Sequence, residues 1–151
     1  MAVTIRRYQT TDFDRALALG HLMHKESYYS FMEFSDKKVR GLFDSALRDE
    51  NTYHFNVAEK DGEIVGFMFG IKHPHFFSDE EVSGDLFFYV RQDLRGSMIG
   101  IRLIKGYMEW AKEQGVSYAQ LGITTNINTD RTSALLERMG FEFGGTLYRK
   151  E

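Results

Sequence analysis

Cysteine is absent from the 151-residue sequence. Its absence excludes disulfide bonds, thiolate metal sites, iron–sulfur ligation and a cysteine nucleophile, and it suits a reducing compartment. Proline occurs only once. Hydrophobic residues make up 42% of the chain and charged residues 27%, which is the composition of an ordered globular chain and not of a disordered one.

Long hydrophobic runs are also missing. The longest apolar stretch, Ile64–Ile71, covers about eight residues, whereas a helix that spans a bilayer needs ~20. The first residues, Met1–Arg7, contain no hydrophobic segment of the kind that a secretory signal requires. We therefore expect no membrane association and a cytoplasmic location.

A strong excess of either charge is lacking as well, because 19 Lys and Arg stand against 22 Asp and Glu, a formal net charge of −3. The charges are spread evenly along the chain, without a basic stripe that would mark a nucleic-acid-binding surface. The sequence therefore predicts no nucleic-acid partner. Its length suits one domain with its own hydrophobic core, so we expect a single domain over residues 1–151.

Hydrophobic periodicity and turn signals divide the chain into strands and helices. The pair Asp61-Gly62 is a strong signal for a β-hairpin. The order of elements, β-α-α-β-β-β-α-β-α-β, predicts an α/β fold with a mixed central sheet, helices on both faces and a short C-terminal edge. The predicted elements are strands at Val3–Tyr8, Thr52–Glu59, Glu63–Lys72, Asp85–Arg91, Val116–Thr124 and Phe141–Lys150, and helices at Asp12–Ser27, Ser35–Arg48, from Gly100 to a stop at Gly115, and from Asn128 or Thr129 to Met139.

The most informative segment is Arg95-Gly96-Ser97-Met98-Ile99-Gly100, which joins a predicted strand to a predicted helix. A turn of this kind directs several backbone N–H groups to one spot, where the helix dipole adds positive potential. This arrangement favours a phosphate group: Gly96 allows close approach, Ser97 donates a hydroxyl or caps the helix, and Arg95 pairs with the charge. A tight turn that merely packs the helix on the sheet explains the same six residues equally well.

The segment Val90–Gly100 closely resembles the acetyl-CoA pyrophosphate motif of the GNAT family of N-acetyltransferases. The resemblance extends to the strand ending Ile5-Arg6, to the Asp61-Gly62 hairpin and to Leu136–Phe141, so it covers nearly the whole chain. It implies a GNAT-type sheet and the transfer of an acetyl group from acetyl-CoA, as co-substrate, to a primary amine. Direct attack in a ternary complex is expected, because no cysteine is present to carry the acetyl group.

The resemblance places the cofactor around this loop and the start of the last helix. A backbone N–H near Val90 is expected to stabilise the oxyanion that forms on attack at the thioester. By the same resemblance Asn128 and Arg131 reach the CoA arm, although helix capping and a surface charge explain them equally well. The cofactor-binding residues predicted in this way are Val90, Arg95, Gly96, Ser97, Met98, Ile99, Gly100 and Asn128.

Two positions depart from the family pattern. Met98 stands where the family usually has glycine, so its side chain must point away from the phosphates. Leu136 stands where the family often has the tyrosine that protonates the leaving thiolate. A general acid contributes roughly 10²–10⁴ in rate, but a thiol has a pKa of ~8.5, so the thiolate departs without full protonation.

The nucleophile needs a base, because an alkylammonium with a pKa near ~10.4 is mostly protonated at neutral pH. Asp85 is the first candidate, with Glu81 and Glu26 as further options, and a solvated carboxylate near a loop is the alternative for each. Tyr89 and Tyr148 are candidates for the missing acid, and an ordinary aromatic residue on a sheet face is the alternative for each. The predicted catalytic residues are therefore Asp85, Tyr89 and Tyr148.

The amine acceptor is expected on the side of the first two helices, with Glu26, Tyr28, Tyr29 and Glu81 as substrate-binding residues. Solvated carboxylates and a hydrophobic plug between the helices explain these residues as well. The histidines of His73-Pro74-His75 lack a third well-spaced ligand, so no metal site is predicted.

Two further possibilities stay open. A non-catalytic acyl-CoA-binding or sensor protein on the same fold is the alternative function, because Leu136 replaces the usual acid. The acceptor, a small molecule or a peptide amine, is not identified by the sequence. A homodimer is a possible assembly, since an exposed strand edge is expected near the C-terminal end.

Overall fold

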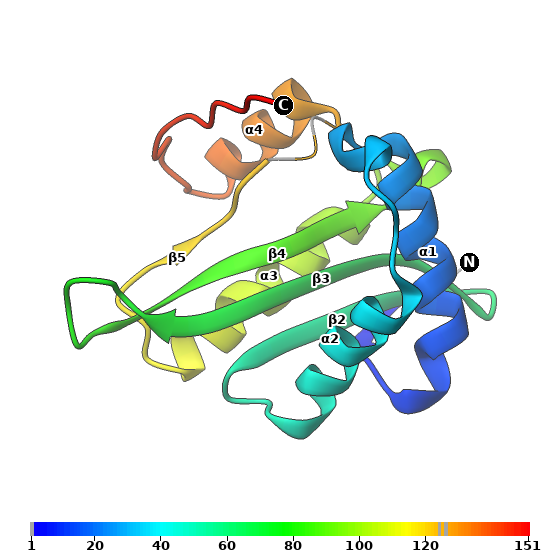
Figure 1. The fold of residues 1–151 in the computed structure, drawn as a ribbon, viewed down its shortest axis with the longest axis horizontal. Coiled ribbons are helices and arrows are strands. Elements are labelled where there is room, and N and C mark those ends of the chain that lie inside the picture. Colours follow the sequence, from blue (N-terminus) through cyan, green and yellow to red (C-terminus); the bar gives the residue numbers. More distant parts are fainter. Residues whose placement is uncertain (1, 124, 126) are drawn as a thin grey trace.

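The structure is a computed structural model that describes residues 2–123, 125 and 127–151. Its elements follow one another in the order shown in Figure 1. They are β1 (Thr4–Arg7), η1 (Thr10–Asp12), α1 (Phe13–Glu26), η2 (Tyr28–Phe31), α2 (Asp36–Arg48), β2 (Tyr53–Lys60), β3 (Glu63–Pro74), β4 (Glu81–Val90), η3 (Gln92–Leu94), α3 (Ile99–Glu113), β5 (Ala119–Gln120) and α4 (Thr129–Arg138), where η marks a 3₁₀ helix.

The strands form one mixed sheet in the order β1-β2-β3-β4-β5. The first four strands pair antiparallel, and β4 pairs parallel with β5. The hairpin between β2 and β3 turns at Asp61 and Gly62, which both have positive φ angles of 52° and 78°. Two positive φ angles are what a two-residue turn between twisted strands requires, so the hairpin prediction is confirmed.

Helices cover both faces of the sheet, as predicted (Figure 1). Side chains alternate along β3, so that Phe67 and Phe69 face α1 and α2 while Met68 faces α3. The core under α1 and α2 is rich in phenylalanine, and the core under α3 is built around Leu103 and Tyr107. The α4 helix lies on the β5 side of the sheet, beside the last residues of the chain (Figure 1).

The predicted sixth strand, Phe141–Lys150, is wrong, because the chain runs there without secondary structure. Its composition favours a strand, but a strand also needs a partner edge, and β5 offers only two paired residues. Gly144-Gly145 also interrupts the segment, and Gly145 has a φ of 148°. The sheet of the described residues therefore has five strands.

Two other strands have different limits from those predicted. β4 begins at Glu81 rather than Asp85, because β3 continues to Pro74 and both strands extend the hairpin. β5 is confined to Ala119–Gln120, whereas the prediction ran from Val116 to Thr124. Thr124 lies outside the described residues. The short β5 decides where the candidate site forms, because the chain leaves β4 immediately after it.

Candidate functional site

A cavity of about 430 Å³ opens where β4 and β5 separate. Its volume lies in the range of ligand-binding pockets in proteins. The second half of β4 forms one wall, and the chain after β5 together with α4 forms the opposite wall. The connection from β4 to α3 closes one end of the cavity.

The separation of the two strands begins at Asp85. β4 and β5 pair only at Ser83 with Ala119 and at Gly84 with Gln120. Beyond these pairs the N–H of Gly122 donates to Oδ1 of Asp85 at 2.8 Å. The Asp85 carboxylate thus accepts the hydrogen bond that a backbone carbonyl would accept in a regular ladder. From this point on the two strands separate. We call this point the β4–β5 fork.

A β-bulge adjoins the fork. The register between β3 and β4 shifts between Phe69 and Gly70, which pair with Phe87 and Asp85 and leave Leu86 without a partner on β3. Bulges of this kind bend a strand and redirect its side chains, and they are common next to active sites. The bulge therefore turns the second half of β4 toward the cavity.

Asp85 is half-buried at the fork. Burial raises the pKa of Asp85 to about 6, although the hydrogen bond from Gly122 N–H favours the charged form. A carboxylate with this pKa exchanges protons close to neutral pH, which is the property that a general base needs. The sequence-based candidate for the base thus lines the cavity and has a pKa suited to the role.

Beyond the bulge, the backbone N–H and C=O groups of every second residue of β4 point into the cavity. Arg91 N–H donates to Val65 O on β3 at 2.8 Å, so the peptide groups of Val90 and, two residues earlier, Phe88 point to the opposite side. Consistent with this, Val90 O accepts from Arg95 Nε at 3.0 Å. The N–H groups of Phe88 and Val90 are therefore available to a ligand that lies along β4.

The glycine loop, residues 95–98, leads from η3 into α3. Gly96 has a φ of 88°, a conformation that side chains rarely adopt. Ser97 Oγ donates to Leu94 O at 2.6 Å, so this hydroxyl closes the loop. The N–H groups of Gly100 and Ile101, in the first turn of α3, have no acceptor within the helix. Met98 is 59% exposed at the cavity mouth.

The N–H groups of Gly100 and Ile101, together with the loop backbone at Gly96, form what we call the cradle. The side chain of Arg95 does not point into this cradle. Its two Nη atoms donate to the Glu26 carboxylate at 2.6 and 2.7 Å. Tyr89 Oη donates to the same carboxylate at 2.7 Å. The Arg95 guanidinium lowers the pKa of Glu26, and burial, followed by the Glu26 charge, raises the pKa of Tyr89 to about 12. Glu26 is thus an anion held by two donors.

Arg131, in the first turn of α4, lies beside the glycine loop, where the sequence predicted the side chain of Arg95. A Cβ added to Gly96 would collide with the Arg131 guanidinium, so this group lies directly against the glycine loop. No ion pair or hydrogen bond joins Arg131 to another residue in the part of the chain that the structure describes. An unpaired guanidinium beside free helix N–H groups fits the diphosphate of a nucleotide-like ligand.

The predicted site residues fall into two groups. Most of those expected at the cofactor line the cavity, including Asn128, which precedes α4 with a φ of 45°. Leu136 also lines the cavity and is buried. Three candidates lie elsewhere. Ile99, predicted to bind the cofactor, is buried in the core under α3. Glu81 is exposed at the start of β4, 3.7 Å from Lys72 Nζ, and Tyr148 is 89% exposed.

Tyr28 and Tyr29 belong to η2, at the rim of the cavity. Tyr28 N–H donates to Thr125 O at 2.7 Å, and Thr125 lines the cavity. The link between Glu26 and Arg95, which are 69 residues apart, was not predicted. No local pattern in the sequence signals such a pair, because it depends on how α1 packs beside the end of β4.

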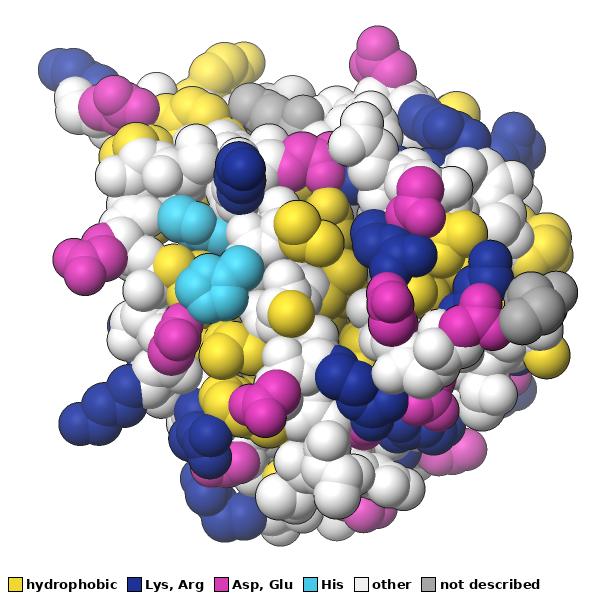
Figure 2. Space-filling model, turned by 90° about the vertical axis from the view of Figure 1, so that its right-hand side faces the viewer, with side chains coloured by type: hydrophobic (Ala, Val, Ile, Leu, Met, Phe, Trp, Pro, Cys, Tyr) yellow, Lys and Arg dark blue, Asp and Glu magenta, His cyan; other side chains and the backbone are white. Residues whose placement is uncertain are grey.

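A membrane-spanning helix and a metal site are both absent from the residues that the structure describes. Among the residues that the structure describes, no helix has both the length and the apolar character needed to cross a bilayer. Within the same residues, no three His, Asp or Glu side chains are grouped as metal ligands. On the face shown in Figure 2, basic and acidic side chains are interspersed with apolar ones.

Comparisons with known proteins agree on the fold. The family model described as the acetyltransferase (GNAT) family matches residues 17–141. No curated protein matches the chain. Similar solved structures include a Trypanosoma brucei acetyltransferase (20% identity, TM-score 0.75, 99% of each chain). Others are glucosamine-6-phosphate N-acetyltransferase from Arabidopsis thaliana (14%, 0.77, 100% of this chain and 99% of that one) and AAC(6')-Iy with the bisubstrate analogue CoA-S-monomethyl-acetylneamine (15%, 0.76, 100% and 99%).

Proposed function

The chain belongs to the GNAT family of acetyltransferases, and from this premise we propose that it transfers the acetyl group of acetyl-CoA to a primary amine by direct attack in a ternary complex. One observation carries the proposal. A half-buried carboxylate with a pKa of about 6 stands at the β4–β5 fork, and a cradle of N–H groups with a free guanidinium lies at the other end of the same cavity.

The residues of the cavity fit the parts of acetyl-CoA. The first N–H groups of α3, the loop backbone at Gly96 and the Arg131 guanidinium would hold the diphosphate. The N–H groups of Phe88 and Val90 would bind the amide-containing arm along the free side of β4. When bound, acetyl-CoA supplies an activated acetyl thioester. Arg95, with its donors on Glu26 and Val90 O, would position the loop.

Asp85 would serve as the base. The proton of an alkylammonium has a pKa of ~10.4, so its transfer to a group of pKa about 6 is unfavourable before attack. The amine therefore loses that proton to water and attacks in its neutral form, because only the neutral nitrogen has a free electron pair. Once this nitrogen has bonded to the acetyl carbon it carries a positive charge, and one of its two protons, now far more acidic, passes to Asp85. The electron pair of the broken C–S bond leaves with the thiolate. A preorganised N–H of β4 stabilises the carbonyl oxygen as charge develops there.

The cavity offers no tyrosine at the family's usual acid position, because Leu136 stands there. The hydroxyl of Tyr89 already donates to Glu26, and its raised pKa of about 12 makes it a weak acid. We therefore propose that the thiolate, whose conjugate acid has a pKa of ~8.5, leaves without a proton from the protein.

Calorimetry with acetyl-CoA and a thiol-release assay across a panel of amines test this function. We expect binding of acetyl-CoA and release of CoA that requires both an amine and Asp85. Failure to bind acetyl-CoA at millimolar concentration would refute the proposal.

The buried Leu136 supports one other candidate, an acyl-CoA-binding protein without transferase activity. This candidate and the enzyme share the cofactor cradle and differ at the fork. Tight binding of acetyl-CoA, combined with no amine-dependent release of CoA by the wild-type chain, would favour the binding protein.

A further inference from the structure

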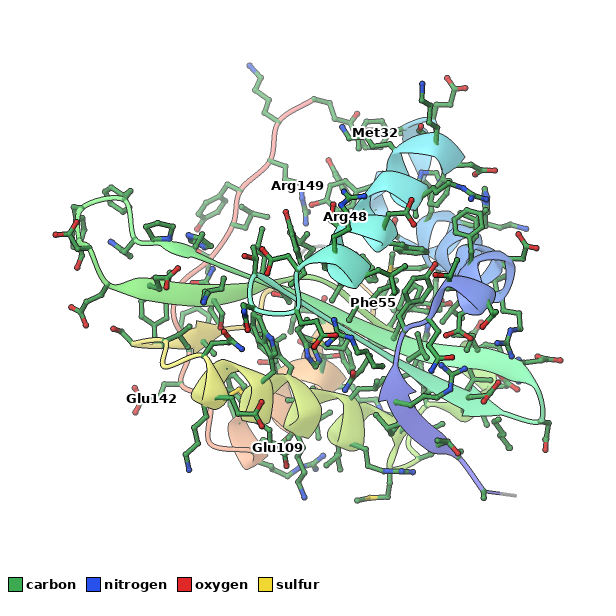
Figure 3. The ribbon with its side chains drawn as sticks, turned by 90° about the horizontal axis from the view of Figure 1, so that it is seen from below. Met32, Arg48, Phe55, Glu109, Glu142 and Arg149 are labelled. Atoms are coloured by element: carbon green, nitrogen blue, oxygen red, sulfur yellow. The ribbon has the colours of Figure 1, made fainter. Side chains whose placement is uncertain are left out.

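A buried tyrosine of α3 lies behind the β4–β5 fork. Tyr107 and Ser83 are both 0% exposed, and neither lines the cavity. In Figure 3 Glu109 lies on the side of α3 that faces away from the sheet. Tyr107 comes two residues earlier, about half a turn of the helix, so its side chain faces the sheet. It reaches the sheet where β4 and β5 are paired.

The Tyr107 hydroxyl joins α3 to both strands of the fork. Tyr107 Oη donates to Gln120 O at 3.1 Å, and Gln120 is the last residue of β5. Because this bond uses the one hydroxyl hydrogen, Ser83 Oγ is the donor in its 3.0 Å contact with Tyr107 Oη. Ser83 belongs to β4 and pairs with Ala119, the other residue of β5. We call Ser83, Tyr107 and Gln120 the Tyr107 clasp.

The Tyr107 ring also lies against the β-bulge. A Cβ added to Gly70 would lie 2.5 Å from Cε1 of Tyr107, so only glycine leaves room for the ring there. Gly70 is the residue of β3 that pairs with Asp85 at the bulge. The Trp110 ring stacks on that of Tyr107, at a centroid distance of 6.2 Å and an angle of 22°. These contacts fix the ring, and with it the hydroxyl, beside the strand that carries Asp85.

The β5 strand depends on the clasp because it is so short. It has two paired residues, fewer than strands of globular proteins usually have, and among the described residues it pairs only with β4. Two residues after Gln120, the N–H of Gly122 donates to the Asp85 carboxylate at 2.8 Å. The position of this N–H, and of the chain that shields Asp85 from water, therefore depends on where the end of β5 is held.

The groups around Asp85 show which changes its pKa would report. Burial raises this pKa to about 6, the N–H groups of Gly122 and of Asp85 itself lower it, and no charged side chain of the described residues contributes. Gly70, opposite on β3, does not titrate. On the side of α3 the titratable neighbour is Tyr107. Burial raises the pKa of Tyr107 to about 12, and the Asp85 charge adds to the rise, so the hydroxyl remains a donor at neutral pH.

We propose that Tyr107 is a positioning residue of the acetyl transfer: its hydroxyl fixes the end of β5 and thereby sets the place and the hydration of the Asp85 carboxylate. This role rests on the proposed function, in which Asp85 is the base. Removal of the hydroxyl takes one donor from Gln120 O and the acceptor from Ser83 Oγ, while the ring still fills the space against Gly70. The end of β5 is then held less firmly, and water reaches Asp85.

The first experiment uses the full chain without any substrate. The carboxyl carbon of Asp85 is followed by NMR through a pH titration, and Asp85→Asn identifies its resonance. In Tyr107→Phe the pKa should fall by about one pH unit toward the ordinary carboxyl value of ~3.9, because burial affects this pKa more than the Gly122 donor does. Tyr8→Phe removes a hydroxyl from a tyrosine buried in the other core, and it should keep the wild-type pKa.

The second experiment measures amine-dependent release of CoA. Tyr107→Phe should lower kcat about tenfold to a hundredfold, because the base is misplaced. The acid side of its pH–rate profile should move to lower pH together with the pKa of Asp85. Affinity for CoA, measured by calorimetry, should stay at the wild-type value, because the cradle lies at the other end of the cavity. A merely structural role of Tyr107 would reduce the amount of folded chain and leave the pH midpoint unchanged.

Each outcome decides between the clasp and its alternatives. An Asp85 pKa that stays constant or rises in Tyr107→Phe would overturn the proposal, as would an equal fall in Tyr8→Phe. Should Tyr107→Phe fail to fold, Ser83→Ala removes the other partner of the hydroxyl and should move the pKa in the same direction. An unchanged pKa in that variant would overturn the proposal as well.

Failure of the clasp and failure of the proposed function are distinguishable. Acetyl transfer by the wild type, combined with an Asp85 pKa that does not respond to Tyr107→Phe, would overturn the role of Tyr107 alone. A lowered Asp85 pKa in Tyr107→Phe, combined with no acetyl transfer by the wild type to any amine, would refute the transferase function and leave the effect of the clasp on Asp85 standing.

Discussion

Asp85 shows how the surroundings of one residue produce a chemical property. Its carboxylate lies where β4 and β5 part, half-buried, with one hydrogen bond from Gly122 N–H. The backbone N–H donors do not offset the loss of water, so burial raises the pKa to about 6. Glu81, only four residues earlier on the same strand, is exposed and lies 3.7 Å from Lys72 Nζ. Two carboxylates of one strand thus have different surroundings.

Replacement of Asp85 by Asn removes the proposed base and keeps the side-chain shape. The variant should lose about 10²–10⁴-fold in kcat/KM. In the wild type, kcat/KM should fall as the pH drops below about 6, because protonated Asp85 cannot accept a proton. A pH–rate profile measures both effects. Glu81→Gln is the matched control, and an equal loss there would show that general electrostatics, and not a base at the fork, governs the rate.

His54 predicts a pH dependence of stability at a position remote from the cavity. It is 5% exposed against Tyr107 and Trp110, its Nε2 has no partner among the described residues, and burial lowers its pKa to about 4. Between pH 6.5 and 4 the unfolded chain binds a proton there that the folded chain does not. The free energy of unfolding therefore falls as the pH falls through this window.

In the variant His54→Phe, the free energy of unfolding should fall between pH 7 and pH 4 by about 3 kcal/mol less than in the wild type. Urea unfolding at pH 7 and at pH 4 measures it as a difference between variant and wild type, so the opposite contribution of Asp85 cancels. His73→Phe, the same change at an exposed histidine, should keep the wild-type slope. Identical slopes for both variants would contradict the assignment.

At the scale of elements, the contact between α1 and the glycine loop decides what Arg95 does. The last residue of α1, Glu26, binds both Nη atoms of Arg95, and the Arg95 side chain is only 13% exposed. A bidentate, partly buried pair is stronger and more directional than an ion pair on the surface. The pair therefore fixes the loop against the helix, and in the proposed function Arg131 would be the arginine that binds the phosphates.

The variant Glu26→Gln tests the role of this ion pair with Arg95. Weaker positioning of the loop should reduce affinity for CoA about tenfold, although Glu26 itself lies on α1 and not in the cradle. Calorimetry with CoA measures the change. Glu63→Gln, which breaks the exposed pair with Arg91, is the control and should bind normally. Tighter binding by Glu26→Gln would mean that the freed Arg95 serves the phosphates, which is the role predicted from the sequence.

At the scale of the whole molecule, the C-terminal segment, residues 142–151, contributes little to stability because it is not part of the five-stranded sheet. The two packed cores contain residues from the sheet and from α1, α2 and α3, but none from residues 142–151. Exposed apolar side chains in this segment, Phe143 and Leu147 among them, bury little surface. The homodimer predicted from the sequence stays a prediction.

Removal of residues 144–151 should lower the free energy of unfolding by no more than about 2 kcal/mol, because the segment supplies no core residue and its contacts include the cation–π pairs of Arg149 and one hydrogen bond to Glu151. The urea m-value should stay unchanged, because the surface buried on folding is nearly the same. Equilibrium urea unfolding of the shortened and full chains tests this. A loss of several kcal/mol would mean that the segment pairs with the sheet as the predicted sixth strand.

Much of the fold was predictable from the sequence, because local patterns follow local physics. The Asp61-Gly62 hairpin, the helices and the glycine loop before α3 depend on periodicity and on turn residues close together in the chain. The same reasoning failed for Phe141–Lys150. Its residues favour a strand, but whether a strand forms depends on a free edge that other parts of the chain provide.

The sequence by itself determined the order of elements, the mixed sheet with helices on both faces, and the family pattern of the glycine loop, because each is encoded in residues a few positions apart. Only the tertiary structure decided which side chains meet. It paired Arg95 with Glu26, brought Arg131 to Gly96, and placed Arg149 over Tyr28. These contacts join residues from distant parts of the chain, and their geometry depends on helix packing and on the short β5, which no local pattern specifies.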